Sequence, residues 1–420
     1  MSKFKKVVLD NGIRIVTERI PYVKSVSLGL WVNAGSRNES EKESGISHFI
    51  EHMFFKGTKR RSAKDIAIAM DSIGGELNAF TSRESTTYYS KVLDTHVKEG
   101  VELLSDIFLN SLIDDKEIEK EKQVILEELK MVEDTPDDYI HDLYTHTVWP
   151  KHPLGRSILG NLETVAWFKR KNFINYLDKN YYPKNIVISA AGNFELKRLI
   201  RLLDKSLGRL ERAETARHQI TPEIKGRISV KKKRLEQIHI CLGAKGLSHV
   251  HKDRYALYAL NTMLGSSMSS RLFQEIREKR GLVYAIYSYI SAFRDTGLFT
   301  VYAGTSQSSV FEVIHLIMQE FKNLKEKRIA PSELNKGLEQ MKGNLMLSLE
   351  STSSRMSKNA KDELYFNRYV PFEEIIKNIN NVTAKQIQRL ANELFDRNLI
   401  TLTAIGDISK KDIDEDLLRC

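Results

Sequence analysis

Two segments of this 420-residue chain repeat one order of elements about half a chain apart, and this repeat restricts the folds open to it. The first, residues 185–193, is an apolar strand stopped by a glycine, and a helical segment over 196–207 follows it. The second, residues 398–407, is again an apolar strand stopped by a glycine, with a helix-like segment over 410–418 after it. We interpret the repeat as two halves built on one supersecondary plan. The alternative is a chance similarity between two strand–glycine–helix units.

The boundary between the halves falls in a polar segment at residues 211–225, which contains a proline and lacks apolar periodicity. We therefore expect an N-terminal domain over residues 1–210, a linker over 211–225 and a C-terminal domain over 226–420. Strand-like alternation, as at 25–32, and long amphipathic helical patterns, as at 115–132, occur in clusters. Such clustering favours an α+β fold, in which each half is an antiparallel or mixed sheet packed by helices.

Composition excludes several classes of protein. Hydrophobic residues make up 41% of the chain and charged residues 29%, the balance of a globular protein rather than a disordered or fibrous one. The net charge of +10 comes from 65 basic and 55 acidic residues that are interleaved along the chain. The densest basic run, residues 231–234, is short, so a solvated charged surface is favoured over nucleic-acid binding.

Cysteine usage and apolar patterning indicate the compartment. Only two cysteines occur, which excludes a disulfide framework and a cysteine-type zinc site and fits a reducing environment. No stretch approaches about 18 uncharged apolar residues, so no transmembrane helix is expected. Because a strand–turn–strand pattern already begins at residue 7, we expect no targeting segment. We expect a cytoplasmic protein with neither a nucleic-acid nor a membrane partner.

The most informative segment is His48-x-x-Glu51-His52, where apolar residues such as Phe49 and Met53 recur at helical spacing. On a helix, two histidines four residues apart lie on one face, about 6 Å apart along the axis. That spacing lets two imidazoles reach one tetrahedral Zn²⁺. Glu51 lies close enough to this face to act as a general base on water at the metal. The alternative is a helix whose polar residues are solvated or hydrogen-bonded.

A catalytic zinc also needs a third protein ligand, and the best candidates lie in the helical pattern over 117–129. Glu121 and Glu128 are two turns apart on one face, with apolar residues between them. Glu119 and Glu127 occupy neighbouring faces. Composition does not choose among these carboxylates, and a plain charged helix is a further alternative.

In combination these motifs resemble the pitrilysin/insulinase family of zinc metallopeptidases, M16. The closest match is the short branch that contains bacterial proteins similar to mitochondrial processing peptidase beta. The order His48-x-x-Glu51-His52 is that of the inverted zincins. The resemblance implies that Glu128 is the third zinc ligand and that Glu121 is a helper carboxylate in the active site.

The resemblance extends to the segment after the histidine motif and into the second half of the chain. Residues 74–81 resemble the family's Gly-Gly and edge strand, which implies that Asn78, Ala79 and Phe80 bind substrate as an added β-strand. Residues 265–284 resemble the family's C-terminal-domain signature. Since that half has no H-x-x-E-H motif, it matches the family's non-catalytic half.

Two residues of the C-terminal signature would contribute to catalysis. The resemblance implies that Arg277 and Tyr284 orient the substrate carbonyl and stabilise the oxyanion, a role that suits a cation and a phenol. Without the resemblance, Arg277 is explained as a solvated helix cation and Tyr284 as a core aromatic.

The resemblance therefore implies a zinc metalloendopeptidase that hydrolyses extended peptides or unfolded segments. Short members complete an enclosed chamber by dimerising, so a homodimer with two active sites is expected. The alternative is a non-catalytic or partner-dependent subunit of a processing-peptidase-like complex. Such relatives usually lose ligands, and the full ligand set in this chain argues against that alternative.

Overall fold

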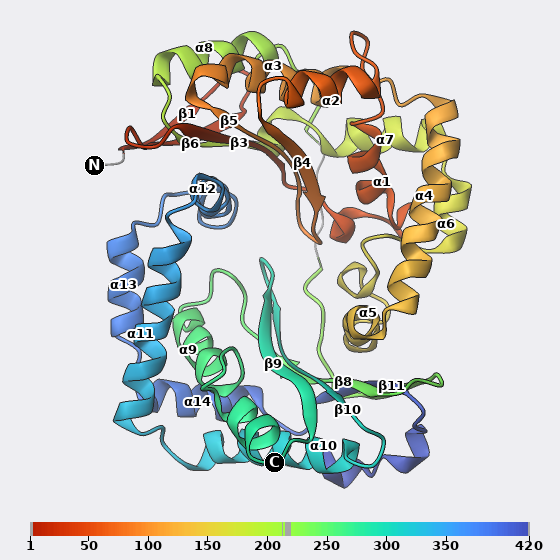
Figure 1. The fold of residues 1–420 in the computed structure, drawn as a ribbon, viewed down its shortest axis with the longest axis vertical. Coiled ribbons are helices and arrows are strands. Elements are labelled where there is room, and N and C mark those ends of the chain that lie inside the picture. The colour runs from red at the N-terminus through yellow and green to blue at the C-terminus, as the bar shows by residue number, and fades with distance from the viewer. Residues whose placement is uncertain (1–2, 212, 215–219, 419–420) are drawn as a thin grey trace. The chain divides into compact units, whose positions relative to one another are not determined.

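The computed structural model describes residues 3–211, 213–214 and 220–418, which fall into two compact units (Figure 1). The first unit comprises Met1–Met131, Arg156–Gln219 and Ser348–Tyr369, and the second comprises Val132–Gly155, Ile220–Leu347 and Val370–Cys420. Each unit thus takes a segment from the far half of the sequence, whereas the sequence suggested two contiguous domains. The expected linker lies partly outside the described residues.

The first unit is built on a six-stranded sheet in the order β1-β2-β6-β3-β5-β4. Its strands are β1 (Lys3–Val8), β2 (Arg14–Arg19), β3 (Ser25–Val32), β4 (Glu76–Thr81), β5 (Thr86–Leu93) and β6 (Ile186–Gly192). The β2 and β6 strands pair in parallel and every other neighbouring pair is antiparallel. The sheet is therefore mixed, as expected, and β4 is an edge strand.

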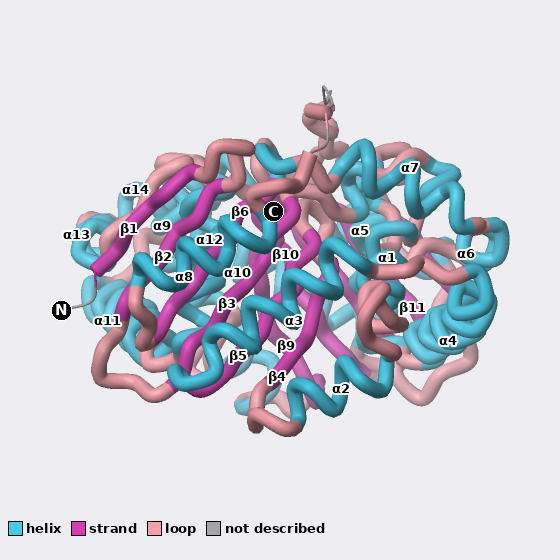
Figure 2. Tube along the Cα trace, turned by 90° about the horizontal axis from the view of Figure 1, so that it is seen from above, coloured by secondary structure: helices cyan, strands magenta, loops and turns pink. Residues whose placement is uncertain are grey.

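Both faces of this sheet are covered by helices. Successive residues of β2, Ile15 and Val16, belong to different apolar clusters, because side chains alternate across a strand. The first cluster includes residues of α1 (Ile46–Met53), α3 (Val97–Asn110), α7 (Arg170–Asn180) and α8 (Leu196–Leu207). Figure 2 shows α3 and α8 lying over the strands. The second cluster includes residues of α12 (Thr352–Phe366), which therefore packs on the opposite face. The remaining helices are α2 (Ala63–Asp71), α4 (Asp115–Asp134) and α6 (Leu162–Trp167).

Buried ion pairs fix α12 to the first sheet although it comes from the far half of the chain. The Glu18 carboxylate on β2 is 1% exposed and accepts hydrogen bonds from Arg355 and Asn359 of α12. Glu363 of α12 is also 1% exposed and pairs with Arg14 at 3.1 Å. Since an unpaired buried carboxylate is costly, these pairs specify which sheet α12 covers.

The second unit repeats this architecture on a five-stranded sheet in the order β7-β11-β8-β10-β9. Its strands are β7 (Ile228–Lys232), β8 (Ile238–Lys245), β9 (Val283–Ala292), β10 (Gly297–Thr305) and β11 (Thr401–Gly406). The strand β11 pairs in parallel with β7 and antiparallel with β8, as β6 does with β2 and β3. The shared topology supports the interpretation of the chain as two halves of one plan.

Helices cover both faces of the second sheet as well. Cys241 of β8 packs with residues of α5 (Pro136–Val148), which the first half of the sequence supplies. Its neighbours Ile240 and Leu242 face a larger cluster that includes α9 (Arg254–Leu264), α10 (Val310–Glu326) and α14 (Ala384–Leu394). The unit also contains α11 (Pro331–Ser348) and α13 (Phe372–Asn380).

The prediction of a helix over residues 410–418 is wrong. That segment forms only two short 3₁₀ turns, Lys410–Asp412 and Glu415–Leu418. The Asp412 side chain accepts a hydrogen bond from the backbone of Ser409 at 2.8 Å, and the Asp414 side chain accepts one from the backbone of Asp416 at 2.9 Å. Such local acceptors compete with helical hydrogen bonds and interrupt the helix.

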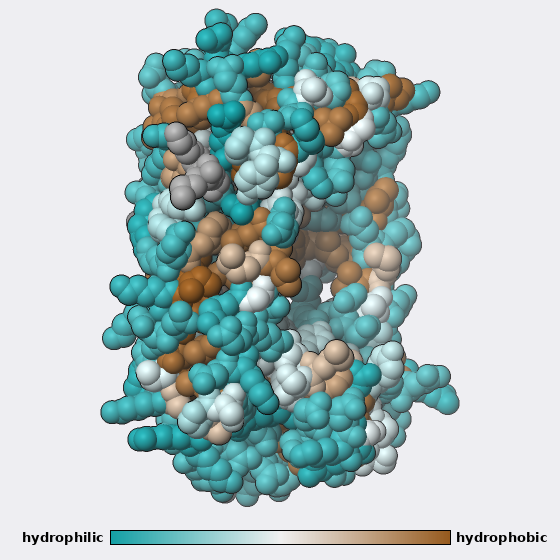
Figure 3. Space-filling view, turned by 60° about the vertical axis from the view of Figure 1, so that its left-hand side comes forward, coloured by the Kyte–Doolittle hydropathy of each residue, from teal (hydrophilic) through white to brown (hydrophobic). Residues whose placement is uncertain are grey.

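On the face shown in Figure 3, hydrophilic residues predominate and apolar side chains form small groups between them. Within the described residues, no helix is both long enough and apolar enough to cross a membrane.

Candidate metal centre

Helix α1 carries both histidines of the H-x-x-E-H motif. It begins after Gly45, whose φ of 95° is left-handed, and a Cβ at that position would lie 2.6 Å from the carbonyl oxygen of Leu159. Phe49, Ile50 and Met53 are buried against the first sheet's core. Because these apolar residues fix one side of the helix inward, the two histidines lie on its other side.

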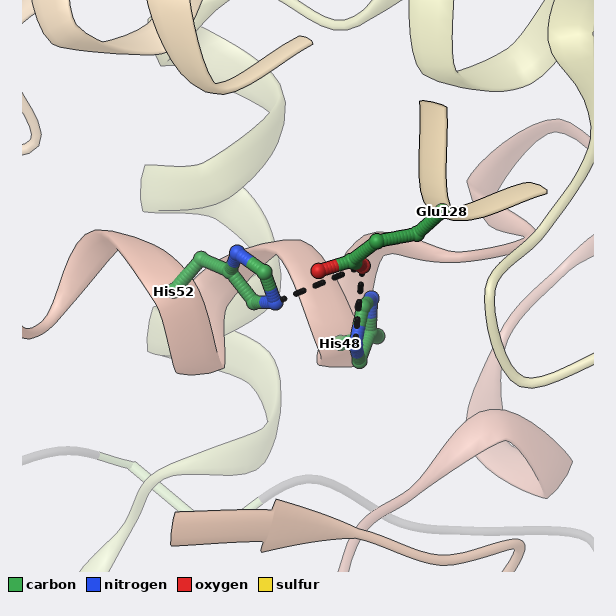
Figure 4. Close-up of side chains that lie close together, drawn as sticks. All are labelled: His48, His52 and Glu128. Atoms are coloured by element: carbon green, nitrogen blue, oxygen red, sulfur yellow. Dashed lines mark ion pairs between the residues drawn. The ribbon is translucent and has the colours of Figure 1, made fainter. Parts of the chain in front are cut away.

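The structure brings His48, His52 and Glu128 together (Figure 4). Oε2 of Glu128, which reaches across from α4, lies 3.9 Å from Nε2 of His48 and 3.7 Å from Nε2 of His52. The imidazole rings are 4.6 Å apart between centroids. One ligand atom from each residue lies within 4.8 Å of the others.

This arrangement fits a zinc ion. Two ligands at about 2.1 Å from a tetrahedral zinc are roughly 3.4 Å apart, and the distances from Glu128 to the two histidines, 3.9 and 3.7 Å, are close to that value. The observed separations are too long for direct hydrogen bonds. Burial, with the charge of His52, lowers the pKa of His48 to about 3, so this imidazole is neutral, as a metal ligand must be.

The structure distinguishes among the four candidate carboxylates of α4. The side chains of Glu119 and Glu127 are 69% and 70% exposed and pair with lysines on the same helix. Glu128 is 31% exposed and faces the histidines, whereas Glu121 is 4% exposed. Of these four carboxylates, Glu128 is the one whose oxygen belongs to the cluster with His48 and His52. Position therefore distinguishes it from the three other candidates that the sequence left open.

Glu121 lies behind His52. Its Oε1 is 2.9 Å from Nδ1 of His52, and its Oε2 is 2.7 Å from Nζ of Lys56. Burial raises the pKa of Glu121, but the hydrogen bonds with His52 and Lys56 outweigh it and lower the pKa below its usual value. An ionised Glu121 accepts the Nδ1 proton of His52, which directs Nε2 toward the cluster.

Glu51 lies one position before His52, on the side of α1 that faces β4. The hydroxyl of Thr81, the last residue of β4, donates a short hydrogen bond to Oε2 of Glu51. Burial raises the pKa of Glu51, while the Thr81 bond and the charge of His52 oppose that shift. A carboxylate with a raised pKa beside a metal site is suited to proton transfer.

The strand expected to bind substrate is where the sequence placed it. Asn78, Ala79 and Phe80 lie on β4, whose outer edge pairs with no other described strand. Phe80 is 39% exposed and rests edge-on against Trp31 at 5.5 Å between centroids.

Arg277 and Tyr284 lie in the second unit and near each other. Arg277 is on a π-helical turn, Phe273–Glu278, and its guanidinium lies 5.6 Å from the ring centroid of Tyr284. Tyr284 is 79% exposed at the start of β9, so the explanation of this residue as a core aromatic is wrong.

Sequence reasoning missed three residues that support the cluster: Lys56, Thr81 and Glu39. Lys56 is four residues after His52, a spacing that would place both side chains on one face of a helix. The helix α1 itself ends before Lys56, at Met53. Glu39 accepts hydrogen bonds from the backbone N–H groups of Gly45 and Ser47 at 2.8 and 2.9 Å. No sequence pattern pairs a carboxylate with backbone six and eight residues later.

Comparisons with known proteins place the chain in a family. The sequence model described as "Insulinase (Peptidase family M16)" matches residues 14–162, and the one described as "Peptidase M16 inactive domain" matches residues 168–341. The uncharacterized zinc protease YmxG of Bacillus subtilis is 45% identical over 391 residues, which cover 93% of this chain and 95% of that protein. An uncharacterized zinc protease of Streptomyces coelicolor is 37% identical over 97% of this chain and 90% of its own.

Solved structures share the fold. A protease from Helicobacter pylori superposes with a TM-score of 0.89 at 24% identity, covering 97% of this chain and 100% of that one. A structure from Pseudomonas fluorescens titled as a peptidase M16 inactive domain gives 0.91 at 16% identity, covering 97% and 99%. Together with the sequence matches, these likenesses confirm the resemblance expected from the motifs: the chain belongs to peptidase family M16, the insulinase family.

Proposed function

We propose that the protein is a zinc-dependent endopeptidase. The observation that carries the proposal is the convergence of two imidazoles on α1 and one carboxylate on α4, with ligand atoms within 4.8 Å of one another. Two histidines and a carboxylate are a donor set that leaves one zinc position open for chemistry. The names of the relatives, which call them zinc proteases, support the choice of metal and reaction class.

The chain's own residues divide the work of hydrolysis. Zinc, when bound, supplies Lewis acidity that polarises the scissile carbonyl and activates water. Glu51 takes the proton of the attacking water and later gives it to the leaving amine. Glu121 holds the tautomer of His52, and Lys56 keeps Glu121 ionised.

The substrate class follows from the free edge of β4. A peptide that adds to this edge is bound through its backbone, so side-chain preference is loose and the substrate must be extended. Peptides and unfolded segments meet this requirement, whereas folded proteins do not. The oxyanion-stabilising roles of Arg277 and Tyr284, like the homodimer, rest on the family resemblance alone.

A non-catalytic subunit is the second candidate, since residues 168–341 match a domain described as inactive. One experiment separates the two. Purified protein is incubated with a quenched-fluorescent peptide, with and without 1,10-phenanthroline, and zinc is then restored. We expect hydrolysis that the chelator abolishes and zinc recovers. Light scattering on the same sample identifies its oligomeric state. Zinc-loaded protein that cleaves no peptide in that state would favour the non-catalytic subunit.

A further inference from the structure

We propose that Thr81 is a positioning residue for Glu51, holding one carboxylate oxygen so that the other is presented to the attacking water. This inference rests on the proposed function, because it assigns Glu51 the role of general base. It concerns a residue that neither the motif nor the ligand cluster includes.

The contact that carries the inference joins the edge strand to the metal-site helix. The hydroxyl of Thr81 donates to Oε2 of Glu51. Leu77 and Ala79, which share the face of β4 with Thr81, pack against the core cluster that contains α1 residues. Thr81 therefore points toward α1 because strand alternation and core packing leave it no other face.

Among the residues that the structure describes, only one of the two oxygens of Glu51 has a hydrogen-bond partner. Within the described part of the chain, Oε2 accepts from Thr81 and Oε1 makes no hydrogen bond. A base needs one oxygen free to receive a proton and gains from having the carboxylate plane fixed. Glutamate has three rotatable side-chain bonds, so without this hydroxyl the carboxylate would sample several orientations.

The backbone of Thr81 is itself well fixed. It pairs with Thr86 as the last pair of the β4–β5 ladder. The turn that follows is closed by a hydrogen bond from the N–H of Ser82 to the carbonyl of Ser85 at 2.8 Å. A β-branched side chain in such a strand has restricted χ1, so the hydroxyl is placed with little freedom.

A single short segment, residues 35–39, ties this turn to the start of α1. The N–H of Arg37 donates to the carbonyl of Arg83 at 2.8 Å, and the N–H of Ser36 donates to the carbonyl of Ser82 at 3.3 Å. At the other end of the segment, Glu39 accepts hydrogen bonds from the backbone N–H groups of Gly45, which precedes α1, and of Ser47 in its first turn.

The approach of this segment to the turn is close. A Cβ at Gly35 would lie 2.1 Å from the carbonyl oxygen of Ser82, so only glycine permits it. The segment is hydrogen-bonded to the turn after Thr81 at one end and to the start of α1 at the other. It therefore sets the distance between the hydroxyl of Thr81 and the carboxylate of Glu51.

The test compares Thr81→Val, which is nearly isosteric but lacks the hydroxyl, with Thr81→Ser, which keeps it. We expect Thr81→Val to lower kcat about 10- to 100-fold, the loss typical of a hydrogen bond to a charged group. Its KM for the peptide should stay within about twofold, and its zinc content and Tm should match the native protein. Thr81→Ser should recover most of the lost kcat. The matched control is Thr17→Val, which removes the hydroxyl of a strand threonine on β2 that donates to the backbone carbonyl of Lys5.

A second readout does not depend on turnover. In crystals of the native protein we expect one orientation of the Glu51 carboxylate, and in Thr81→Val several orientations or a rotated one. An unmoved carboxylate, an unchanged kcat, or a serine variant as impaired as the valine variant would overturn the inference. If the native protein hydrolyses no peptide, the proposed function fails, and the crystals alone decide whether Thr81 positions Glu51.

Discussion

Nδ1 of His52 lies 2.9 Å from Oε1 of Glu121, and this contact sets which nitrogen of the ring faces the ligand cluster. Replacing Glu121 with glutamine keeps the shape but removes the charge that accepts the Nδ1 proton. We expect Glu121→Gln to weaken zinc binding about 10- to 100-fold, measured by competition with a chromophoric chelator. Glu119→Gln, on an exposed face of the same helix, should bind zinc as the native protein does. Equal affinities in the two variants would remove Glu121 from its supporting role.

Adjacent glutamates on α4 provide a sharp test of the third ligand. Glu128 faces the imidazoles, whereas Glu127 is 70% exposed and pairs with Lys130. We expect Glu128→Gln to lose most bound zinc in elemental analysis of the purified protein, because glutamine is a poor zinc ligand. Glu127→Gln should retain one zinc per chain. Loss of zinc in Glu127→Gln together with full zinc in Glu128→Gln would contradict the assignment of Glu128 as the third ligand.

The base can be separated from the ligands. In Glu51→Gln the three ligands are intact, so we expect full zinc content together with a loss of peptide hydrolysis by several orders of magnitude, since no proton acceptor remains. Inductively coupled plasma analysis and the quenched-fluorescent assay measure the two properties on one sample. Native-like turnover in this variant would refute the assignment of Glu51.

The raised pKa of Glu39 predicts that the free energy of unfolding depends on pH. Burial raises its pKa from 4.5 to about 7, although the hydrogen bonds from Ser47 and Gly45 and the charge of Arg156 oppose that shift. The folded protein therefore holds this proton more tightly than the unfolded chain. The stabilisation that the tighter binding of this proton gives the folded protein is complete below pH 4.5, and it is lost as the pH rises through about 7. A shift of this size corresponds to about 3 kcal/mol of unfolding free energy.

Glu39→Gln, which stays neutral at every pH, isolates this contribution from all other titrating groups. Urea unfolding of both proteins should give a difference in unfolding free energy, native minus variant, that falls between about pH 5 and about pH 8. A difference that is constant or rises with pH would show that Glu39 is ionised in the folded protein throughout.

Local patterns predicted much of the fold. The strand at 25–32 has the bounds that its alternation suggested, because that signal depends on near neighbours. The edge strand at 76–81 was expected from the family resemblance, and it lies there. The exchange of α5 and α12 between the units was not predictable. An amphipathic helix shows that one face is buried, but the sheet that covers it is chosen by distant pairs such as Glu18 with Arg355.

The candidate site divides in the same way. The spacing of His48 and His52 indicated their shared face, since a helix alone determines it. The choice of Glu128 needed the family resemblance, because residues of one helix face are equivalent in the sequence. Thr81 was unpredictable as a partner of Glu51, since their contact depends on how the β4–β5 turn docks beside α1.

The central claim is that one zinc ion binds between α1 and α4. Anomalous diffraction from crystals of the native protein, recorded on both sides of the zinc absorption edge, tests this claim most directly. The account predicts one strong peak per chain at about 2.0–2.2 Å from Nε2 of His48, Nε2 of His52 and a carboxylate oxygen of Glu128. Crystals grown with zinc that show no peak there, with Glu128 turned away from the imidazoles, would contradict it.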